Sequence, residues 1–244
     1  MASRARTYAA PVSRARTHAI LPFVYRRLLD ERGHQRWWPG ETPFEVVVGA
    51  ILTQNTAWTN VERAIAALKA AGALDPASVL ALPQERLAAL IRPAGCCNVK
   101  ERRLREVVRF VVEEAGGRIE TLAGPEPAAL RARLLAIPGV GRETADSILL
   151  YAVGVPSFVV DAYTRRIFGR IGVADPGADY DAIRAVFEAA LPRDAPLFND
   201  YHAQIVAHGK HVCRTVPRCA ECGIADLCRS TGVPAERPDV RRRT

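Results

Sequence analysis

Apolar residues recur every three or four positions through most of this chain. Leu21, Val24 and Leu28 show the spacing near the start, and residues 107–112 show it again further along. This spacing places apolar side chains on one face of an α-helix, whereas a half-buried strand needs strict alternation, which no stretch here sustains. The pattern therefore predicts an all-α protein.

Capping signals mark where two of these helices begin. Thr42-Pro43-Phe44-Glu45 is a capping box with proline at the first helical position, and Thr59-Asn60-Val61-Glu62 is a second capping box. We predict a helix start at both. Loops that contain proline or glycine separate the other helical segments, which we place at residues 84–91, 99–115, 127–136, 141–151, 161–171, 181–190 and 198–211.

The charge balance favours a polyanionic partner. The 244 residues include 34 Lys and Arg against 26 Asp and Glu, which gives a net charge of +8. That charge suits nucleic acid and, taken alone, also an anionic membrane surface. No apolar run approaches the roughly 20 residues that a bilayer span needs. We therefore expect a soluble protein with no membrane partner.

Basic tails are expected at both ends. Ser-Arg-Ala-Arg-Thr occurs at residues 3–7 and again at 13–17, and the two copies hold four arginines and no acid. We expect residues 1–18 to form a flexible basic tail, which either binds phosphate or is a disordered start without a role. Residues 231–244 are expected to form a second basic tail.

Six cysteines fall into two groups. Cys96 and Cys97 are adjacent, and the other four lie within 16 residues, separated by gaps of five, two and five: Cys213, Cys219, Cys222 and Cys228. No apolar leader precedes Ala19, so we expect a cytoplasmic protein that is not secreted and keeps its thiols reduced. Four thiolates this close can enclose one metal centre, and the spacing alone leaves zinc and a [4Fe-4S] cluster both open.

A glycine turn joins two of the predicted helices. Ile137-Pro138-Gly139-Val140-Gly141 stands directly before Arg142 and Glu143. Glycine allows backbone angles that other residues avoid, and the unpaired amides at a helix N-terminus attract anions. We therefore expect Gly139, Gly141 and Arg142 to bind a phosphate, although an ordinary helix-helix turn would have a similar local sequence.

This turn, followed by Val159-Val160-Asp161 at 18 residues beyond Glu143, strongly resembles the endonuclease III superfamily of helix-hairpin-helix DNA glycosylases. The resemblance covers residues 43–228. It implies a six-helix barrel at 42–155, with the hairpin at 135–150, and an iron–sulfur cluster domain built from 19–41 and 156–230. The active-site cleft would lie between the two domains. It also implies a monomer that acts on damaged double-stranded DNA at the nucleoid.

Asp161 resembles the catalytic carboxylate of that family. Cleavage of an N-glycosidic bond builds positive charge on the sugar, which a fixed carboxylate stabilises while it orients or deprotonates the attacking water. Asp161 is also a good helix N-cap, and the two roles can coexist. Glu143 stands where bifunctional members have a lysine that forms a Schiff base. Glutamate cannot form one, so the resemblance implies a monofunctional glycosylase.

The tryptophans resemble those of the 3-methyladenine glycosylase branch of the superfamily. Trp37-Trp38-Pro39 and the segment that ends at Trp58 carry the likeness. A flipped cationic purine between tryptophan faces would gain roughly 1–2 kcal/mol from each. Trp37, Trp38 and Trp58 are therefore the predicted base pocket, with core or domain-junction aromatics as the alternative.

Gln54 resembles the residue that fills the space left by the extruded base. Cys96 stands at the second wedge position, where relatives have a bulkier apolar residue, so it is a smaller plug. We predict further phosphate contacts, and list them together: Lys100, Arg214 and Arg218. The alternative for these basic residues is a solvated surface.

The four clustered cysteines resemble the C-terminal [4Fe-4S] ligands of the family, which favours that cluster over zinc. The first gap is one residue shorter than in the family. Two further readings stay open. One is a glycosylase for oxidised pyrimidines or mismatches, and the other is a DNA-binding relative with little catalysis.

Borohydride treatment tests the absence of a lysine nucleophile. We predict no trapped covalent complex with damaged DNA, because borohydride reduces an imine and Glu143 cannot form one. The measurement is denaturing gel electrophoresis of the treated mixture. A strong trapped band that survives substitution of the other lysines would contradict the assignment.

Overall fold

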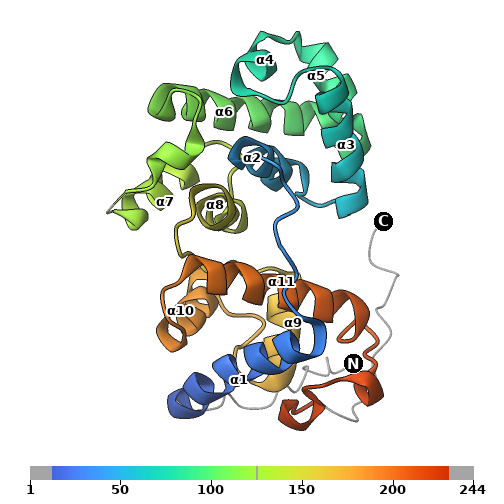
Figure 1. Ribbon diagram of the computed structural model, residues 1–244, viewed down its shortest axis with the longest axis vertical. Helices are drawn as coiled ribbons and strands as arrows, with labels where there is room; N and C mark the ends of the chain where they lie inside the picture. The colour runs from blue at the N-terminus through green and yellow to red at the C-terminus, as the bar shows by residue number, and fades with distance from the viewer. Residues whose placement is uncertain (1–12, 125, 231–244) are drawn as a thin grey trace, which may run out of the picture. The chain divides into compact units, whose positions relative to one another are not determined.

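The structure is a computed structural model that describes residues 13–124 and 126–230. All regular elements in this part are helical, which confirms the all-α prediction (Figure 1). Backbone contacts divide the chain into two compact units. We call Trp38–Val159 the hairpin unit, and the described residues up to Trp37 and from Val160 onward the cysteine unit. The sequence had placed these divisions at 41/42 and 155/156.

The hairpin unit is built around one apolar helix. Every residue of α2 (Pro43–Leu52) after the initial proline is buried, and α2 packs against α3, α6 and α8. Figure 1 shows it between α6 and α8. The elements that follow α2 are α3 (Trp58–Ala70), α4 (Pro76–Ala81), α5 (Gln84–Ile91), η1 (Arg92–Ala94), α6 (Cys97–Ala115), η2 (Ile119–Leu122), α7 (Pro127–Leu135), α8 (Arg142–Ser147) and the π-helical turn η3 (Ile148–Val153).

Side-chain caps fix the starts of some helices, and the two predicted capping boxes differ in this respect. The Thr42 hydroxyl accepts a hydrogen bond from the Glu45 amide at 3.1 Å, which confirms the predicted start of α2. The return bond of the box differs, because the Glu45 carboxylate accepts from the Glu41 amide at 3.2 Å and not from Thr42. The second predicted capping box is wrong. Helix α3 begins at Trp58, and its N-cap Ala57 makes no side-chain cap, so Thr59 already lies within the first turn.

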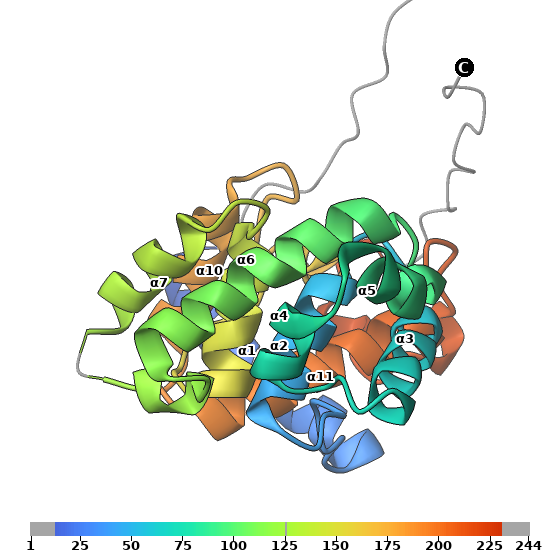
Figure 2. The ribbon, with the colours of Figure 1, turned by 90° about the horizontal axis from the view of Figure 1, so that it is seen from above.

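The sequence patterns overlooked the short helix α4. The Asp75 carboxylate accepts from the Ser78 amide at 2.9 Å and caps it, and Pro76 occupies the first helical position. Aspartate followed by proline is a helix-start signal, but six residues are too few to show a helical period. Helix α6 is much longer, and Figure 2 shows it running alongside α4 and α5.

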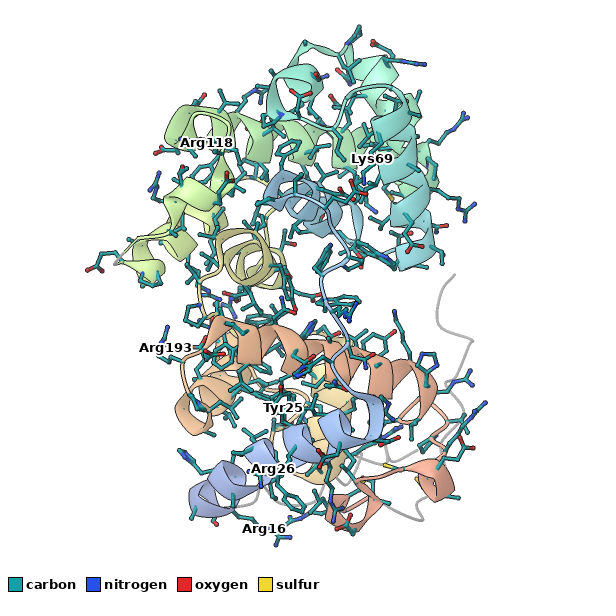
Figure 3. All side chains as sticks on the ribbon, viewed as in Figure 1. Arg16, Tyr25, Arg26, Lys69, Arg118 and Arg193 are labelled. Atoms are coloured by element: carbon teal, nitrogen blue, oxygen red, sulfur yellow. The ribbon has the colours of Figure 1, made fainter. Side chains whose placement is uncertain are left out.

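The cysteine unit combines segments from both ends of the chain. Helix α1 (Arg14–Arg32) packs against α10 (Tyr180–Ala190) and α11 (Ala195–His211), and α11 packs against α9 (Ala162–Ile171). The Tyr25 hydroxyl on α1 donates to the Asp200 carboxylate on α11 at 3.0 Å (Tyr25 is labelled in Figure 3). Two short turns, η4 (Cys219–Glu221) and η5 (Ala225–Leu227), follow α11.

The start of α1 corrects the predicted N-terminal tail. We expected a flexible tail over 1–18, but α1 already begins at Arg14. The Ser13 hydroxyl accepts from the Arg16 amide at 3.4 Å, and Thr17 is buried, so a cap and packing order this stretch. Residues 1–12 and the predicted tail at 231–244 lie outside the described residues. None of the described helices combines the length and apolarity needed to cross a membrane.

A buried ion pair joins the two helices of the hairpin. The Arg131 guanidinium on α7 donates to both Asp146 carboxylate oxygens on α8, at 2.8 and 3.0 Å. The Ser157 hydroxyl donates to the same carboxylate at 2.5 Å. Asp146 is fully buried and Arg131 is 14% exposed. A buried, bidentate pair fixes the angle between α7 and α8 and so shapes the turn between them.

Removal of this ion pair should strongly destabilise the fold. We predict that Asp146→Ala lowers the free energy of unfolding by about 3–5 kcal/mol, because it removes the bidentate carboxylate that pairs with the largely buried Arg131 charge. The matched control is Glu114→Ala, which breaks a pair with Arg133 whose side chains are 45–46% exposed and should cost about 0–1 kcal/mol. Chemical denaturation gives both values. Equal losses would contradict the structural role of Asp146.

Candidate functional site

The hairpin turn presents its glycines at the surface. Gly139 and Gly141 are exposed, as are Arg142 and Glu143 in the first turn of α8. Gly139 has a φ of +88°, and a Cβ there would lie 2.4 Å from the Arg103 side chain. Only glycine fits this position. A Cβ at Gly141 would meet nothing, so the backbone there is open to close approach by another molecule.

Gln54 is held against the hairpin. Its amide nitrogen donates to the Gly139 carbonyl at 3.1 Å and to the Thr144 hydroxyl at 3.0 Å. Its amide oxygen accepts from the Arg103 guanidinium at 2.6 Å. The structure therefore brings together the predicted wedge residue and the predicted phosphate-binding turn. The hydrogen bond from Arg103 had no signal in the sequence, because it depends on how α6 packs.

Lys100 was predicted to contact phosphate, but the structure places its side chain in the interior. The residue is only 3% exposed, and its ammonium donates to the Leu52 and Ala94 carbonyls, each at 2.8 Å. Burial lowers the pKa of Lys100, an effect that Cys96 opposes and Arg103 reinforces. Both carbonyls lie at chain turns, where the helical ladder leaves them unpaired. Lys100 is thus an internal cross-link.

This cross-link joins the two loops that carry the predicted wedge residues. One loop follows α2 and contains Gln54, and the other precedes α6 and contains Cys96. Cys96 is exposed and is the N-cap of α6, with a φ of +46°. A non-glycine residue in this left-handed region stores about 1–3 kcal/mol of strain, which surrounding contacts must sustain. Lys100 supplies such contacts directly behind the turn.

Two of the three predicted pocket tryptophans pack together. The Trp38 and Trp58 rings meet edge to face, with centroids 5.1 Å apart and an interplanar angle of 89°. Tyr151 lies against Trp38 at 5.1 Å. A Cβ at Gly49 would come within 3.4 Å of both tryptophans, so this glycine lets them approach α2. Tyr151 was not recognised from the sequence, where it only ended a predicted helix.

This arrangement corrects the predicted sandwich. Rings in edge-to-face contact leave no slot for a base between Trp38 and Trp58. Trp37 belongs to the cysteine unit. The Lys210 ammonium lies 5.9 Å from the centre of its ring, within the range of cation–π attraction.

Asp161 is the N-cap of α9. Its Oδ1 accepts from the Thr164 amide at 2.7 Å and from the Thr164 hydroxyl at 2.9 Å. Its Oδ2 lies 3.7 Å from Nε2 of His202, and the Asp161 side chain is 13% exposed. Burial lowers the pKa of His202, although Asp161 opposes the effect. The carboxylate is therefore held in one orientation, beside a histidine that the sequence reasoning missed.

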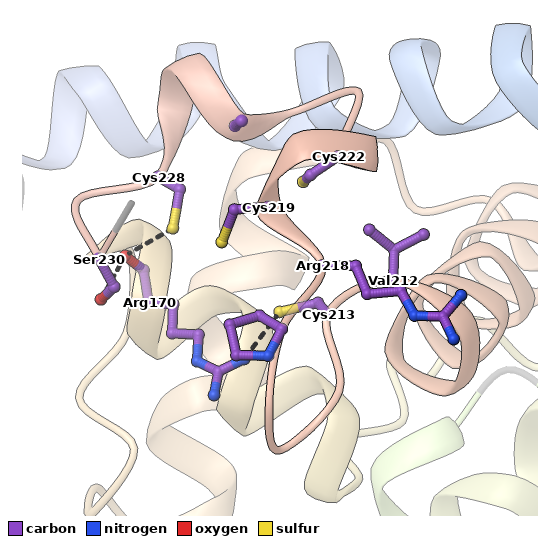
Figure 4. A pocket seen from close by; sticks show the side chains of 10 residues that line it. Arg170, Val212, Cys213, Arg218, Cys219, Cys222, Cys228 and Ser230 are labelled. Atoms are coloured by element: carbon purple, nitrogen blue, oxygen red, sulfur yellow. Dashed lines mark hydrogen bonds between the residues drawn. The ribbon is translucent and has the colours of Figure 1, made fainter. Parts of the chain in front are cut away.

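The four clustered cysteines line one pocket (Figure 4). Burial raises the pKa of the Cys222 thiol, and Coulomb interaction with the other three cysteines adds to this. Nε2 of His208 lies 3.7 Å from the Cys222 sulfur. Among the described residues, no three His, Cys, Asp or Glu side chains form a site for a single metal ion. Four soft donors on one pocket fit a cysteine-ligated cluster.

A basic groove lies beside residues 213–228, which carry the four clustered cysteines and which we call the cysteine segment. It is lined by Lys210 and by the two predicted phosphate contacts Arg214 and Arg218, together with Tyr163 and Arg166. Arg166 donates to the carbonyls of Gly209, in α11, and of Cys213, the first of the four cysteines, at 2.9 Å each. The groove is therefore formed by α9, the end of α11 and the loop after Cys213.

Comparison with known proteins places the chain among base excision DNA repair enzymes. Residues 48–193, which include Gln54, the hairpin and Asp161, match the HhH-GPD superfamily base excision DNA repair proteins. The chain belongs to this superfamily and is a DNA glycosylase. The endonuclease III resemblance is thereby confirmed.

Relatives match over most of the chain. A Methanocaldococcus jannaschii protein assigned to the DNA repair glycosylases is 51% identical over 208 residues, which are 85% of this chain and 94% of the relative. Endonuclease III of Escherichia coli is 31% identical over 188 residues, 77% and 83% of the two chains. The Helicobacter pylori 3-methyladenine DNA glycosylase bound to 1,N6-ethenoadenine superposes with a TM-score of 0.66 and 27% identity, over 80% of this chain and 97% of that one.

Salt dependence distinguishes the internal role of Lys100 from a phosphate contact. We predict that Lys100→Met lowers the free energy of unfolding by about 1–3 kcal/mol, because buried carbonyls lose their donor. The slope of log K against log salt for DNA binding should stay unchanged, since no phosphate contact is lost. Arg102→Met, at the exposed neighbour, is the control for stability. A slope reduced by about one with stability retained would contradict this role.

Proposed function

We propose that this glycosylase is monofunctional and excises alkylated purines such as 3-methyladenine from duplex DNA. The observation that carries the proposal is the fixed carboxylate of Asp161, held by two hydrogen bonds from Thr164 at the start of α9. A carboxylate that is already oriented needs no rearrangement as positive charge develops on the sugar. It can also hold the water that attacks C1′.

The side chain after the hairpin supports water as the nucleophile. Glu143 is exposed in the first turn of α8, where a carboxylate is compatible with the positive end of the helix. An imine requires an amine, which Glu143 lacks. The abasic strand would then be released intact, for later enzymes to process.

The aromatic cluster supports a cationic base as substrate. Trp38 and Trp58 lie beside Gly49, Tyr151 packs against Trp38, and all three rings are partly exposed. A purine with a positive charge from alkylation gains about 0.5–2 kcal/mol on the face of such a ring beyond ordinary stacking. The likeness to the H. pylori 3-methyladenine glycosylase points to the same substrate class.

Two surfaces would hold the duplex. The hairpin amides at Gly139, Gly141 and Arg142 would bind one stretch of backbone, and Arg214 and Arg218 in the basic groove would bind another. Gln54 and Cys96 would fill the space left by the extruded base. We propose that the protein does this as a monomer in the cytoplasm, at the nucleoid.

The four cysteines would hold a [4Fe-4S] cluster. When bound, it would supply a rigid scaffold for the loop between Cys213 and Cys219, which carries Arg214 and Arg218. Such a cluster can accept or donate an electron, but hydrolysis of the N-glycosidic bond requires no electron transfer. The chain's own task here is to hold the basic loop in a fixed shape for phosphate.

Base release from alkylated DNA tests the catalytic assignment. We predict that Asp161→Asn lowers the rate of 3-methyladenine release by about 10²–10³-fold, because the amide keeps the cap and loses the charge. Asp194→Asn is the matched control, since Asp194 caps α11 in the same way, and should release bases at the wild-type rate. Chromatography of the freed bases is the measurement.

Two outcomes would overturn the proposal. Undiminished release by Asp161→Asn would remove the carboxylate from the mechanism. Release from oxidised-pyrimidine or mismatched oligonucleotides, with none from alkylated DNA, would replace the substrate class. Salt-dependent binding without release from any of them would instead support a DNA-binding relative.

A further inference from the structure

One arginine contacts both ends of the segment that carries the four cysteines. Arg170 lies in the last turn of α9 and lines the cysteine pocket (Figure 4). Its Nη1 donates to the Cys213 sulfur at 3.2 Å and to the Arg214 carbonyl at 2.7 Å. Its Nη2 donates to the Thr215 carbonyl at 3.0 Å. The guanidinium thus fixes the beginning of the segment through three acceptors.

The backbone carbonyl of the same residue holds the other end. It accepts from the Arg229 amide at 3.1 Å and from the Ser230 hydroxyl at 3.4 Å, two bonds that do not involve a cysteine sulfur. This carbonyl is available because the last carbonyls of a helix have no acceptor role within it. The start of the segment at Cys213 and the residues directly after Cys228 are therefore both bound to one residue of α9.

The contact with the Cys213 sulfur has an electronic consequence. A planar guanidinium keeps its charge at any physiological pH and directs its N–H groups in a fixed fork. Donation to a ligand sulfur withdraws electron density from it, and hydrogen bonds to the sulfurs are among the factors that set the potential of iron–sulfur clusters. Such donation favours the reduced state, which carries more negative charge.

We propose that Arg170 is a positioning residue for the cysteine-ligated cluster, which closes the ligand segment and raises the cluster's reduction potential through its hydrogen bond to Cys213. This inference rests on the cluster proposed above. The other basic side chain in the same pocket, Arg218, is 53% exposed and lies near Glu221, so it is not bound to a cysteine in this way.

Substitution of Arg170 by lysine tests the hydrogen bonds of the guanidinium separately from its positive charge. Arg170→Lys keeps the positive charge but loses the fork that reaches three acceptors. Arg26→Lys is the matched control, because Arg26 is exposed on α1 of the same unit (Figure 3). Each full-length protein is purified anaerobically, and its iron content, absorbance near 400 nm, far-UV circular dichroism and reduction potential are measured. The rate of iron loss to a chelator is measured as well.

We expect Arg170→Lys to shift the potential to a more negative value and to lose iron several-fold faster than wild type, with unchanged helicity. Arg26→Lys should match wild type in every measurement. A folded Arg170→Lys protein that fails to bind iron would also support the proposal. All four cysteines would still be present in it, and only the contacts of Arg170 with the cysteine segment would have changed.

Full iron content with an unchanged potential and unchanged iron loss in Arg170→Lys would overturn the inference. Wild-type protein that holds zinc, or no metal, would overturn both the cluster and the role of Arg170. Wild-type iron content therefore tells the failure of the cluster apart from the failure of the inference. Base release by wild type, measured separately, reports on the glycosylase proposal.

Discussion

Helix α9 is fixed at both ends by polar contacts, and the candidate chemistry of the cysteine unit depends on it. Asp161 caps the N-terminus through Thr164, while Arg166 in the middle of the helix and Arg170 in its last turn bind the cysteine segment. Ten residues of α-helix span about 15 Å, so the carboxylate and the cysteine segment are joined by one short rigid element. We therefore expect a shift of the segment to move the Asp161 carboxylate as well.

In the hairpin unit, a buried cation connects the segments that carry the candidate site residues. Lys100 satisfies carbonyls from two loops at once, so the loops of Gln54 and Cys96 cannot move independently. Gln54 is in turn bonded to the hairpin at Gly139. A buried ammonium is unfavourable unless its donors are used, and that requirement fixes the loop geometry. The predicted wedge residue Gln54 and the predicted phosphate-binding turn are thus parts of one hydrogen-bonded arrangement.

Local signals were sufficient for most of the helices and for the residues that chemistry singles out. The periodicity placed α5 at its observed bounds, and cysteine spacing and the aspartate after Val160 identified the residues that the structure holds in defined contacts. Tertiary contacts decided the rest. Lys100 follows a surface-like pattern yet points inward, and Trp38 and Trp58 pack on each other instead of leaving a slot between them. Partners such as Tyr151, His202 and Arg170 are distant in sequence and became visible only after folding.

The most direct test of the central claim is a crystal structure with duplex DNA that carries a cationic nitrogen analogue of the sugar at the lesion position. The measured quantity is the distance from the Asp161 carboxylate to that nitrogen. The account predicts an ion pair within about 4 Å, with the Thr164 hydrogen bonds retained. A different acid beside the nitrogen, with Asp161 serving only as a helix cap, would contradict it.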